Sequence, residues 1–299
     1  MGSVLLLVVC FVLGAILRAG RVADEKGPDV LNAVIIYMAL PALALTHGHK
    51  LSIDAGLMLP AAMPWIVFGA GYILFSLAGR LLGLDKKTVV CLTLVAGLGN
   101  TSFVGVPMIE AFFGPELVGV GMVIDLAGTF MVLAVPGMIL AARAAGHGCH
   151  WRSLARKVLL FPPVAALVLG IALQPVALPG WLIVMLERLG STLAPLALLS
   201  VGMTLRPGQI KSNAHLLTLG LGYKLLLAPA LILTLYMVGF GQNDIIARVT
   251  IFEAAMGPMI TGGIIAMTYG LNPSLAAALM GVGIPLSFLT IPVWYWVMR

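Results

Sequence analysis

Long runs of apolar residues alternate with short polar stretches along the whole chain. A helix needs about 20 mostly apolar residues to cross the hydrocarbon core of a bilayer, so such runs predict transmembrane helices. Ten runs have this character, with approximate bounds 3–17, 30–46, 55–79, 88–112, 116–142, 158–173, 181–205, 214–238, 245–268 and 274–298. The pattern predicts an all-α membrane protein with ten transmembrane helices embedded in a lipid bilayer.

The composition supports this interpretation and excludes several other classes of protein. Of the 299 residues, 61% are hydrophobic and only 9% are charged, whereas a soluble domain carries about 25% charged residues. So few charges cannot cover the surface of a globule of this size. We therefore exclude an ordinary cytosolic enzyme, a nucleic-acid binder and a disordered chain, and we expect no nucleic-acid partner.

The basic residues predict the orientation in the membrane. Cytoplasmic connections between transmembrane helices carry an excess of Lys and Arg. With the N-terminus outside, the cytoplasmic connections are 18–29, 80–87, 143–157, 206–213 and 269–273, and they hold 12 of the 17 basic residues. Both termini are therefore expected on the outside of a bacterial-type cytoplasmic (inner) membrane.

The two halves of the chain resemble one another at a shift of about 154–158 residues. The segment 11–17 matches 167–173, and Gly99 and Gly105 fall opposite Gly257 and Gly263. We assign residues 1–142 and 158–299 to two five-helix repeats. Because five is an odd number of spans, the second repeat enters the membrane from the opposite side, which is the inverted-repeat arrangement typical of secondary transporters.

Two predicted spans contain helix-breaking residues at corresponding places, within 97–107 and 253–263. Proline removes a backbone donor and glycine weakens a helix. Broken backbone is tolerated at this depth only where protein buries it or where it lines a cavity. The fourth and ninth spans are therefore expected to be broken and to cross near the middle of the membrane. The alternative is a pair of continuous, proline-kinked helices with glycines for close packing.

Two acidic residues fall far inside predicted spans. Asp125 and Glu253 lie about nine and eight residues into theirs, roughly 12–14 Å deep. A carboxylate at such a depth is costly and usually pairs, titrates or binds an ion. Thr129 shares a face with Asp125, as Met256 does with Glu253. These four residues are predicted to form a cation-coupling site for Na⁺ or H⁺, and the alternative is that each acid is a protonated structural group.

The break in the fourth span also suggests the charge of a ligand. Exposed N–H groups at the start of a half-helix favour anions. The amide of Asn100 and the hydroxyls of Thr101 and Ser102 would suit a carboxylate. Lys224 lies about ten residues into the eighth span; its ammonium is expected to snorkel toward the inner face, with an anion partner or a buried acid as the alternatives.

Several motifs resemble the auxin efflux carrier family, which includes plant PIN carriers and bacterial organic-acid permeases. They are Asn100-Thr-Ser-Phe-Val-Gly-Val-Pro107, Phe113-Gly-Pro115, Asp125-Leu-Ala-Gly-Thr129, Tyr37-Met-Ala-Leu-Pro41, Lys224-Leu-Leu-Leu-Ala-Pro229 and Leu271-Asn-Pro-Ser-Leu275. The resemblance covers essentially the whole chain. It implies scaffold helices at about 3–46 and 158–205, transport helices at about 55–142 and 214–299, and a homodimer. It also places Pro107 and Pro258 at the crossing of the broken helices, so Gly257 and Met259 join the expected substrate-binding residues.

The bile acid–sodium symporters are more distantly similar. Their ninth helix carries a sodium-binding Glu followed by Met, Gln and Asn, whereas Gly257 and Pro258 here replace the polar pair. That family has a second sodium site, and the resemblance implies Thr101, Ser102 and Thr129 as its equivalents here. Na⁺ is the one bound ion that we expect, and its expected ligands are Thr101, Ser102, Asp125 and Glu253.

The combined interpretation is a secondary active transporter, and not an enzyme, that moves a small organic anion by alternating access with coupling to Na⁺ or H⁺. The alternatives are an uncoupled uniporter or channel-like facilitator of organic anions, and a sodium cotransporter of a larger amphipathic anion. Two histidine pairs, His47 with His49 and His147 with His150, are expected on short surface loops and lack the further ligands of a metal site.

Overall fold

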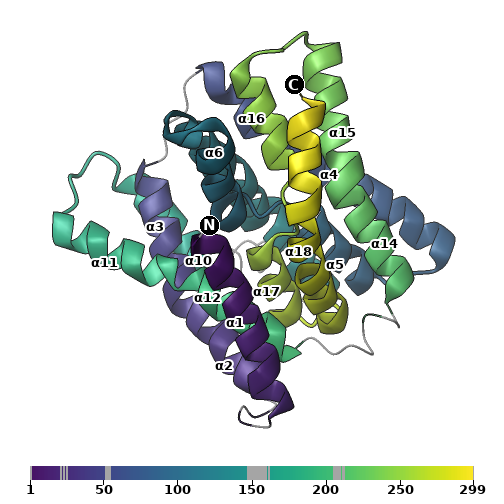
Figure 1. Ribbon diagram of the computed structural model, residues 1–299. Coiled ribbons are helices and arrows are strands. Elements are labelled where there is room, and N and C mark those ends of the chain that lie inside the picture. The colour runs from purple at the N-terminus through teal and green to yellow at the C-terminus, as the bar shows by residue number, and fades with distance from the viewer. Residues whose placement is uncertain are drawn as a thin grey trace. The chain divides into compact units, whose positions relative to one another are not determined.

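The computed structural model of the chain describes residues 2–20, 22, 24, 26–50, 55–146, 160, 162–204, 210 and 213–298. Over these residues the secondary structure is helical, and no strand longer than an isolated bridge occurs (Figure 1). The α-helices are α1 (Gly2–Ala19), α2 (Gly27–Val34), α3 (Leu40–Lys50), α4 (Met58–Leu82), α5 (Lys86–Ala96), α6 (Val106–Phe113), α7 (Val118–Val123), α8 (Met138–Ala144), α10 (Pro162–Ala172), α11 (Gly180–Ser191), α12 (Leu193–Thr204), α14 (Ala214–Gly222), α15 (Ala228–Leu233), α16 (Ile245–Ala254), α17 (Ile260–Thr268) and α18 (Pro273–Val297).

The prediction of an all-helical membrane protein is confirmed. Among the described residues, six continuous helices are long and apolar enough to cross a bilayer. They are Gly27–Lys50, Met58–Leu82, Val118–Ala144, Gly180–Ser200, Ala214–Gly239 and Pro273–Val297. Shorter apolar helices cover Val9–Ala19, Thr101–Phe113 and Pro162–Ala172.

Several helices contain wide π turns, and three of these turns end two residues before a proline. They are η1 (Ile35–Ala39) before Pro41, η3 (Thr101–Gly105) before Pro107 and η7 (Tyr223–Leu227) before Pro229. Proline has no N–H to close an α turn, so a carbonyl one turn earlier loses its partner. A π turn lets a later N–H bond to it, and such turns are frequent at functional sites. The other π segments are η5 (Ile124–Phe130), η6 (Leu133–Gly137) and η8 (Thr234–Gly239).

By its contacts the chain divides into two compact units. The first comprises Met1–Ser52 and Ala134–Leu205. Within it, α1 packs along α12 and α3 packs along α10. Both crossings depend on glycine, because a β-carbon on Gly14 would overlap the carbonyl oxygen of Leu199 and one on Gly170 would overlap that of Leu45. Small residues of this kind allow helix backbones to approach closely in membrane proteins.

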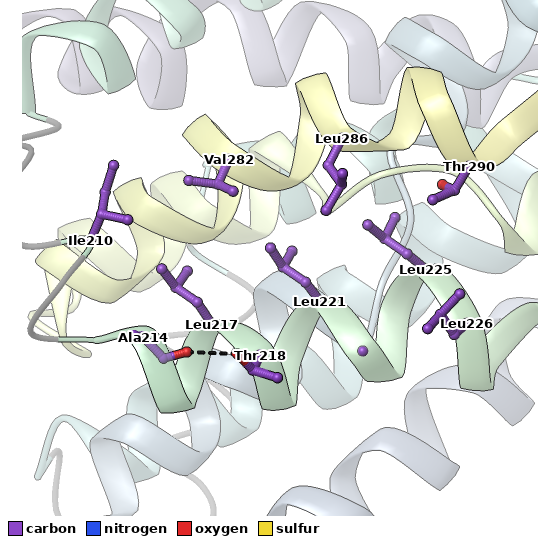
Figure 2. A pocket seen from close by; sticks show the side chains of 11 residues that line it. Ile210, Ala214, Leu217, Thr218, Leu221, Leu225, Leu226, Val282, Leu286 and Thr290 are labelled. Atoms are coloured by element: carbon purple, nitrogen blue, oxygen red, sulfur yellow. Dashed lines mark hydrogen bonds between the residues drawn. The ribbon is translucent and has the colours of Figure 1, made fainter.

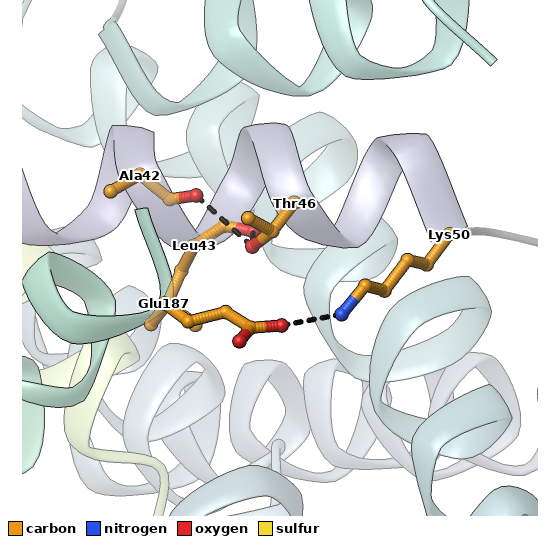
Figure 3. A network of polar contacts seen from close by, with 5 residues as sticks. All are labelled: Ala42, Leu43, Thr46, Lys50 and Glu187. Carbon is orange, nitrogen blue, oxygen red and sulfur yellow. Dashed lines mark hydrogen bonds and ion pairs between the residues drawn. The ribbon is translucent and has the colours of Figure 1, made fainter. Parts of the chain in front are cut away.

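Two polar contacts join helices of the first unit, one between α3 and α11 and one between α12 and α2. The ammonium of Lys50 pairs with Glu187 at 2.5 Å, with both side chains about half exposed (Figure 3). The hydroxyl of Ser200 donates to the amide oxygen of the buried Asn32 at 2.8 Å. The expectation that His47 and His49 lie on a loop is wrong: both fall within α3, whose last turns pack against α10 at Gly48.

The second unit comprises Ile53–Leu133 and Arg206–Arg299. In it α4 packs against η5 and α5, while α18, yellow in Figure 1, packs against α14, α16 and α17. Its interior is apolar and includes the fully buried rings of Phe75, Tyr236 and Phe252. The remaining short helices, η2 (Ala55–Leu57) and η4 (Pro115–Leu117), begin α4 and α7. Every residue predicted for the candidate site belongs to this unit.

Candidate functional site at the helix breaks

Two helices of the second unit are interrupted, and the interruptions cross each other. The segment after α5 leaves helical geometry at residues 97–100, and the segment after α16 does so at residues 255–259. Gly99 and Pro258 form an isolated antiparallel bridge. The N–H of Asn100 donates to the carbonyl of Gly257 at 2.9 Å, and the N–H of Met259 donates to the carbonyl of Val95 at 3.0 Å. Each break therefore satisfies part of the backbone that the other leaves without a helical partner.

The two interrupted helices also begin alike. The Asp85 carboxylate accepts the N–H of Thr88 at the start of α5, and the Asp244 carboxylate accepts the N–H of Ala247 at the start of α16, both at 2.8 Å. Aspartate is a favoured cap because its oxygen satisfies an otherwise unpaired helix N–H. Thr88, through its side chain and backbone, holds the pKa of Asp85 below its ordinary value. The caps fix where each interrupted helix starts.

Lys224 reaches the crossing from η7. Its side chain is 1% exposed, and its ammonium donates to the carbonyl oxygen of Ala254 at 2.9 Å. Ala254 is the last residue of α16, where carbonyls lack helical partners and the helix dipole is negative. A β-carbon on Gly99 would lie 3.1 Å from this ammonium. The expected snorkelling of Lys224 is therefore wrong, because the break in α16 offers the ammonium a partner inside the protein.

Glu253, one residue before that carbonyl, is completely buried. Neither of its carboxylate oxygens has a hydrogen-bond partner among the described residues. A β-carbon on Gly105 of η3 would overlap both oxygens, so the carboxyl group lies directly against this glycine. Asp125 and Lys224 are the charged groups that interact electrostatically with it. A buried carboxyl group without donors needs a proton or a bound cation to offset its lost hydration.

Asp125 lies on η5 and is 3% exposed. The hydroxyl of Thr101 donates to its Oδ1 at 2.6 Å, which links η5 to the residue immediately after the first break. Thr129, on the same π segment, is fully buried, and its hydroxyl has no hydrogen-bond partner among the described residues. The amide nitrogen of Asn100 is buried and without a partner as well. Polar atoms on and beside the crossing are thus left without a partner within the described part of the chain.

The other predicted residues surround the same crossing. Ser102 is half-buried in η3, and Met259 is buried and immediately precedes α17. Pro107 lies in the first turn of α6. Gly257 packs against Ser287 of α18, where a β-carbon would lie 2.8 Å from the Ser287 hydroxyl. Met256 is buried but follows the end of α16, so it does not share a helical face with Glu253 as the sequence pattern suggests.

A separate cavity of about 430 Å³ lies between α14–η7 and α18 (Figure 2). Its lining is aliphatic apart from two hydroxyls. Thr218 donates to the carbonyl of Ala214, drawn as a dashed line in Figure 2, and Thr290 donates to that of Ser287. With those hydroxyls already engaged, the cavity offers no strong polar group to an anion. None of the predicted site residues lines it.

Within the part of the chain that the structure describes, no group of three or more His, Cys, Asp or Glu side chains could hold a metal ion. The histidine pair at 147 and 150 lies outside the described residues.

Comparison with known proteins places the chain in a class. Residues 1–295 match the family described as "Membrane transport protein", so the molecule is an integral membrane protein of a transport family. The chain belongs to this family, as its resemblance to the auxin efflux carriers predicts. It is 28% identical over 298 residues to an "Uncharacterized transporter" of Methanothermobacter thermautotrophicus, covering 98% of this chain and 96% of that protein. It is 25% identical over 307 residues to an "Uncharacterized transporter" of Methanocaldococcus jannaschii, covering 100% and 98%.

Proposed function

We propose that the protein is a secondary active transporter that moves a small organic anion across the cytoplasmic membrane by alternating access, with coupling to Na⁺ or H⁺. The observation that carries this proposal is the crossing of the two interrupted helices. The interrupted segments and the adjoining η5 carry buried polar atoms of Asn100, Thr129 and Glu253 that have no protein partner among the described residues. Such atoms are costly inside an apolar unit unless a ligand or ion completes them.

Two features support an anionic substrate. The half-helices that begin at the crossing, at Thr101 and Ile260, have no side-chain cap at their first residues. Their N–H groups and the positive end of their dipoles therefore favour a negative group. The unpaired amide of Asn100 adds a donor at the same place. We assign carboxylate binding to Asn100, Thr101 and Ser102, with Pro107, Gly257, Pro258 and Met259 shaping the site.

The acidic residues support coupling to a cation. Glu253 is buried without donors, and Asp125 accepts a hydrogen bond from Thr101, whose neighbour Asn100 is assigned to the anion. A cation held by these groups would be coupled to the substrate through adjacent residues of one segment. Sodium needs several hard oxygen ligands, here from Thr101, Ser102, Thr129, Asp125 and Glu253, whereas a proton needs only one carboxylate. We assign Met256 to the packing around Glu253.

A ten-helix inverted repeat is part of this proposal, and the contacts of the first unit support it. In a two-fold arrangement, a contact between two residues recurs between their repeat mates. At the crossing of α1 and α12, Gly14 packs against α12 and Gly202 packs against α1. At the crossing of α3 and α10, Gly48 packs against α10 and Gly170 packs against α3. The mate of Gly14, 156 residues later, is Gly170, and the mate of Gly202, 154 residues earlier, is Gly48. The two crossings therefore exchange under the shift found in the sequence.

The second unit repeats its features at the same shift. Gly83 and Gly241, 158 residues apart, have left-handed φ angles of 67° and 65° and precede the two aspartate caps. Gly114 and Asn272, also 158 residues apart, have φ angles of 96° and 60°, and each precedes a proline. With five spans in each repeat, we assign the helices at about 3–46 and 158–205 to a scaffold and those at about 55–142 and 214–299 to transport.

Uptake into proteoliposomes tests the proposal. Purified protein is reconstituted, and a panel of radiolabelled mono- and dicarboxylates is offered with and without inward Na⁺ and H⁺ gradients. We expect concentrative uptake of a carboxylate that needs one gradient, and its loss in Asn100→Ala but not in Asn243→Ala, which changes an exposed residue. Glu253→Gln and Asp125→Asn should abolish the gradient dependence, whereas the exposed Glu110→Gln should not.

The outcomes separate the alternatives. Equilibration of a carboxylate without concentration under any gradient would identify an uncoupled uniporter or channel. Sodium-driven uptake of a bulky amphipathic anion in preference to small carboxylates would identify a carrier closer to the bile acid–sodium symporters. Wild-type coupling in both acid variants would refute the assigned cation site.

A further inference from the structure

A second cavity of the second unit, of about 240 Å³, lies where α6, the start of α16 and the end of α18 meet. Its walls combine three aromatic rings, three apolar side chains and one cation: Phe112, Phe113, Tyr295, Leu117, Ile245, Met298 and Arg248. None of the residues assigned to the crossing lines this cavity. Arg248 and Glu253 share α16 but are five residues apart, about 7.5 Å along the helix axis.

Arg248 is the feature that the packing does not explain. Its Nε is buried and has no hydrogen-bond partner among the described residues. Asp244, one turn earlier, uses its carboxylate to cap α16, and Glu110 and Glu116 on the neighbouring segment are exposed. A guanidinium is always charged and presents a planar fork of donors that matches a carboxylate. A partly buried guanidinium whose Nε has no hydrogen-bond partner among the described residues is therefore suited to an anion from outside the protein.

The aromatic walls are held in a fixed arrangement. Phe113 lies edge-to-face on Phe252 and on Tyr295, with ring centroids 5.0 and 5.2 Å apart. Phe112 makes an edge-to-face contact with Tyr295 at 5.0 Å, and the Tyr295 hydroxyl donates to the carbonyl of Phe112 at 3.2 Å. Aromatic rings in such contacts present both edges and faces to a further ring. The cavity is thus preformed for a flat apolar group.

We propose that this cavity is a second anion-binding site, which takes a small aromatic carboxylate with its ring against Phe113 and Tyr295 and its carboxylate on Arg248. The size agrees, because an apolar cavity of roughly 150 Å³ holds benzene, and the remaining volume accommodates a carboxylate. The site goes beyond the proposed transport function, since binding here requires neither the crossing nor a cation gradient.

A binding measurement on the purified chain tests the proposal. The purified chain, in nanodiscs of uncharged phosphatidylcholine, is dialysed against radiolabelled benzoate. We expect saturable binding that weakens at least tenfold in Arg248→Gln and less in Arg248→Lys, which keeps the charge but not the fork. Arg188→Gln, which removes an exposed arginine from α11, should bind as the wild type does. Leu117→Trp keeps Arg248 but fills the cavity, and should abolish binding.

Two further comparisons make the result decisive. Binding should persist in Asn100→Ala and Glu253→Gln, so that a failure of the transport proposal leaves this one standing. Uncharged benzyl alcohol should compete at least tenfold more weakly than benzoate. Equal competition by benzyl alcohol, wild-type affinity in Arg248→Gln or Leu117→Trp, or loss of benzoate binding in the two crossing variants would each overturn the proposal.

Discussion

Replacing Lys224 by methionine tests how the crossing is held together. Lys224 is 1% exposed, and among the described residues its ammonium makes one hydrogen bond, at 2.9 Å, to the last carbonyl of α16. A hydrogen bond to a charged group contributes about 1.5–3 kcal/mol to stability. Methionine has a similar length and no charge, so Lys224→Met removes this bond and the favourable charge at the helix C-terminus without opening a large cavity.

The total loss of folding stability in Lys224→Met depends on whether the Glu253 carboxyl group is ionised or protonated. If the carboxyl group is ionised, removing Lys224 leaves an uncompensated buried charge, and the loss rises to about 3–5 kcal/mol. If Glu253 is protonated, the loss stays at the 1.5–3 kcal/mol of the hydrogen bond. Glu253→Gln added to Lys224→Met distinguishes the two cases, because it restores stability only where a charge had been left behind.

Equilibrium unfolding in mixed micelles, followed by tryptophan fluorescence, measures the four corners of this double-mutant cycle. We expect Lys224→Met to lower the free energy of unfolding by at least about 1.5 kcal/mol, and Lys86→Met, an exposed control on α5, to change it by less than about 0.5 kcal/mol. A Lys224→Met protein as stable as the wild type would refute the assignment of Lys224 to the carbonyl of Ala254. A coupling energy within about 0.5 kcal/mol of zero would mean that Glu253 carries no charge that Lys224 offsets.

Three further predictions concern two glycines that the packing leaves no room to enlarge and one aspartate that caps a helix. Gly105→Ala should suppress cation-coupled uptake in proteoliposomes, because the added methyl group displaces the carboxyl group that lies against this glycine, whereas Gly119→Ala, which meets no neighbour, should retain it. Gly14→Ala should lower the free energy of unfolding by about 1–3 kcal/mol, since its helix crossing cannot hold a methyl group; an unchanged unfolding curve would contradict the packing described for α1. Asp85→Ala should cost about 0.5–1 kcal/mol near neutral pH. Because the folded pKa of Asp85 lies below its ordinary value, this cost is full above pH about 4 and should shrink as the pH falls further, which unfolding curves at pH 3 and pH 7 would measure.

The main features of the fold can be predicted from the apolar runs and from glycine and proline. Each of the ten runs is mainly helical over its described residues, and the two runs with clustered helix breakers are interrupted at residues 97–100 and 255–259. Helix breaking is a local property of the backbone, so the sequence alone indicates it. The extent of the unwinding is not local: residues 101–105 form a π turn where we expected broken backbone, since Pro107 frees a carbonyl that a wide turn can satisfy.

The candidate site was less predictable, because its contacts join distant segments. The burial of Asp125 and Glu253 follows from their depth in apolar runs, but the partner of Asp125 is Thr101, 24 residues earlier, and no spacing rule indicates it. The snorkelling of Lys224 is a sound expectation for an intact helix and fails because α16 ends at Ala254. The cavity around Arg248 combines residues from 112 to 298, so only a contact between distant helices reveals it.

The central claim is that the crossing of the interrupted helices is the transport site and opens alternately to the two sides of the membrane. Ser102, half-buried at this crossing, offers a direct probe as Ser102→Cys in a protein whose three native cysteines are replaced. A membrane-impermeant maleimide is applied to intact cells and to inverted vesicles. The account predicts labelling from each side, slowed in both preparations by the transported carboxylate. Labelling from one side only, or labelling that the carboxylate leaves unchanged, would contradict it.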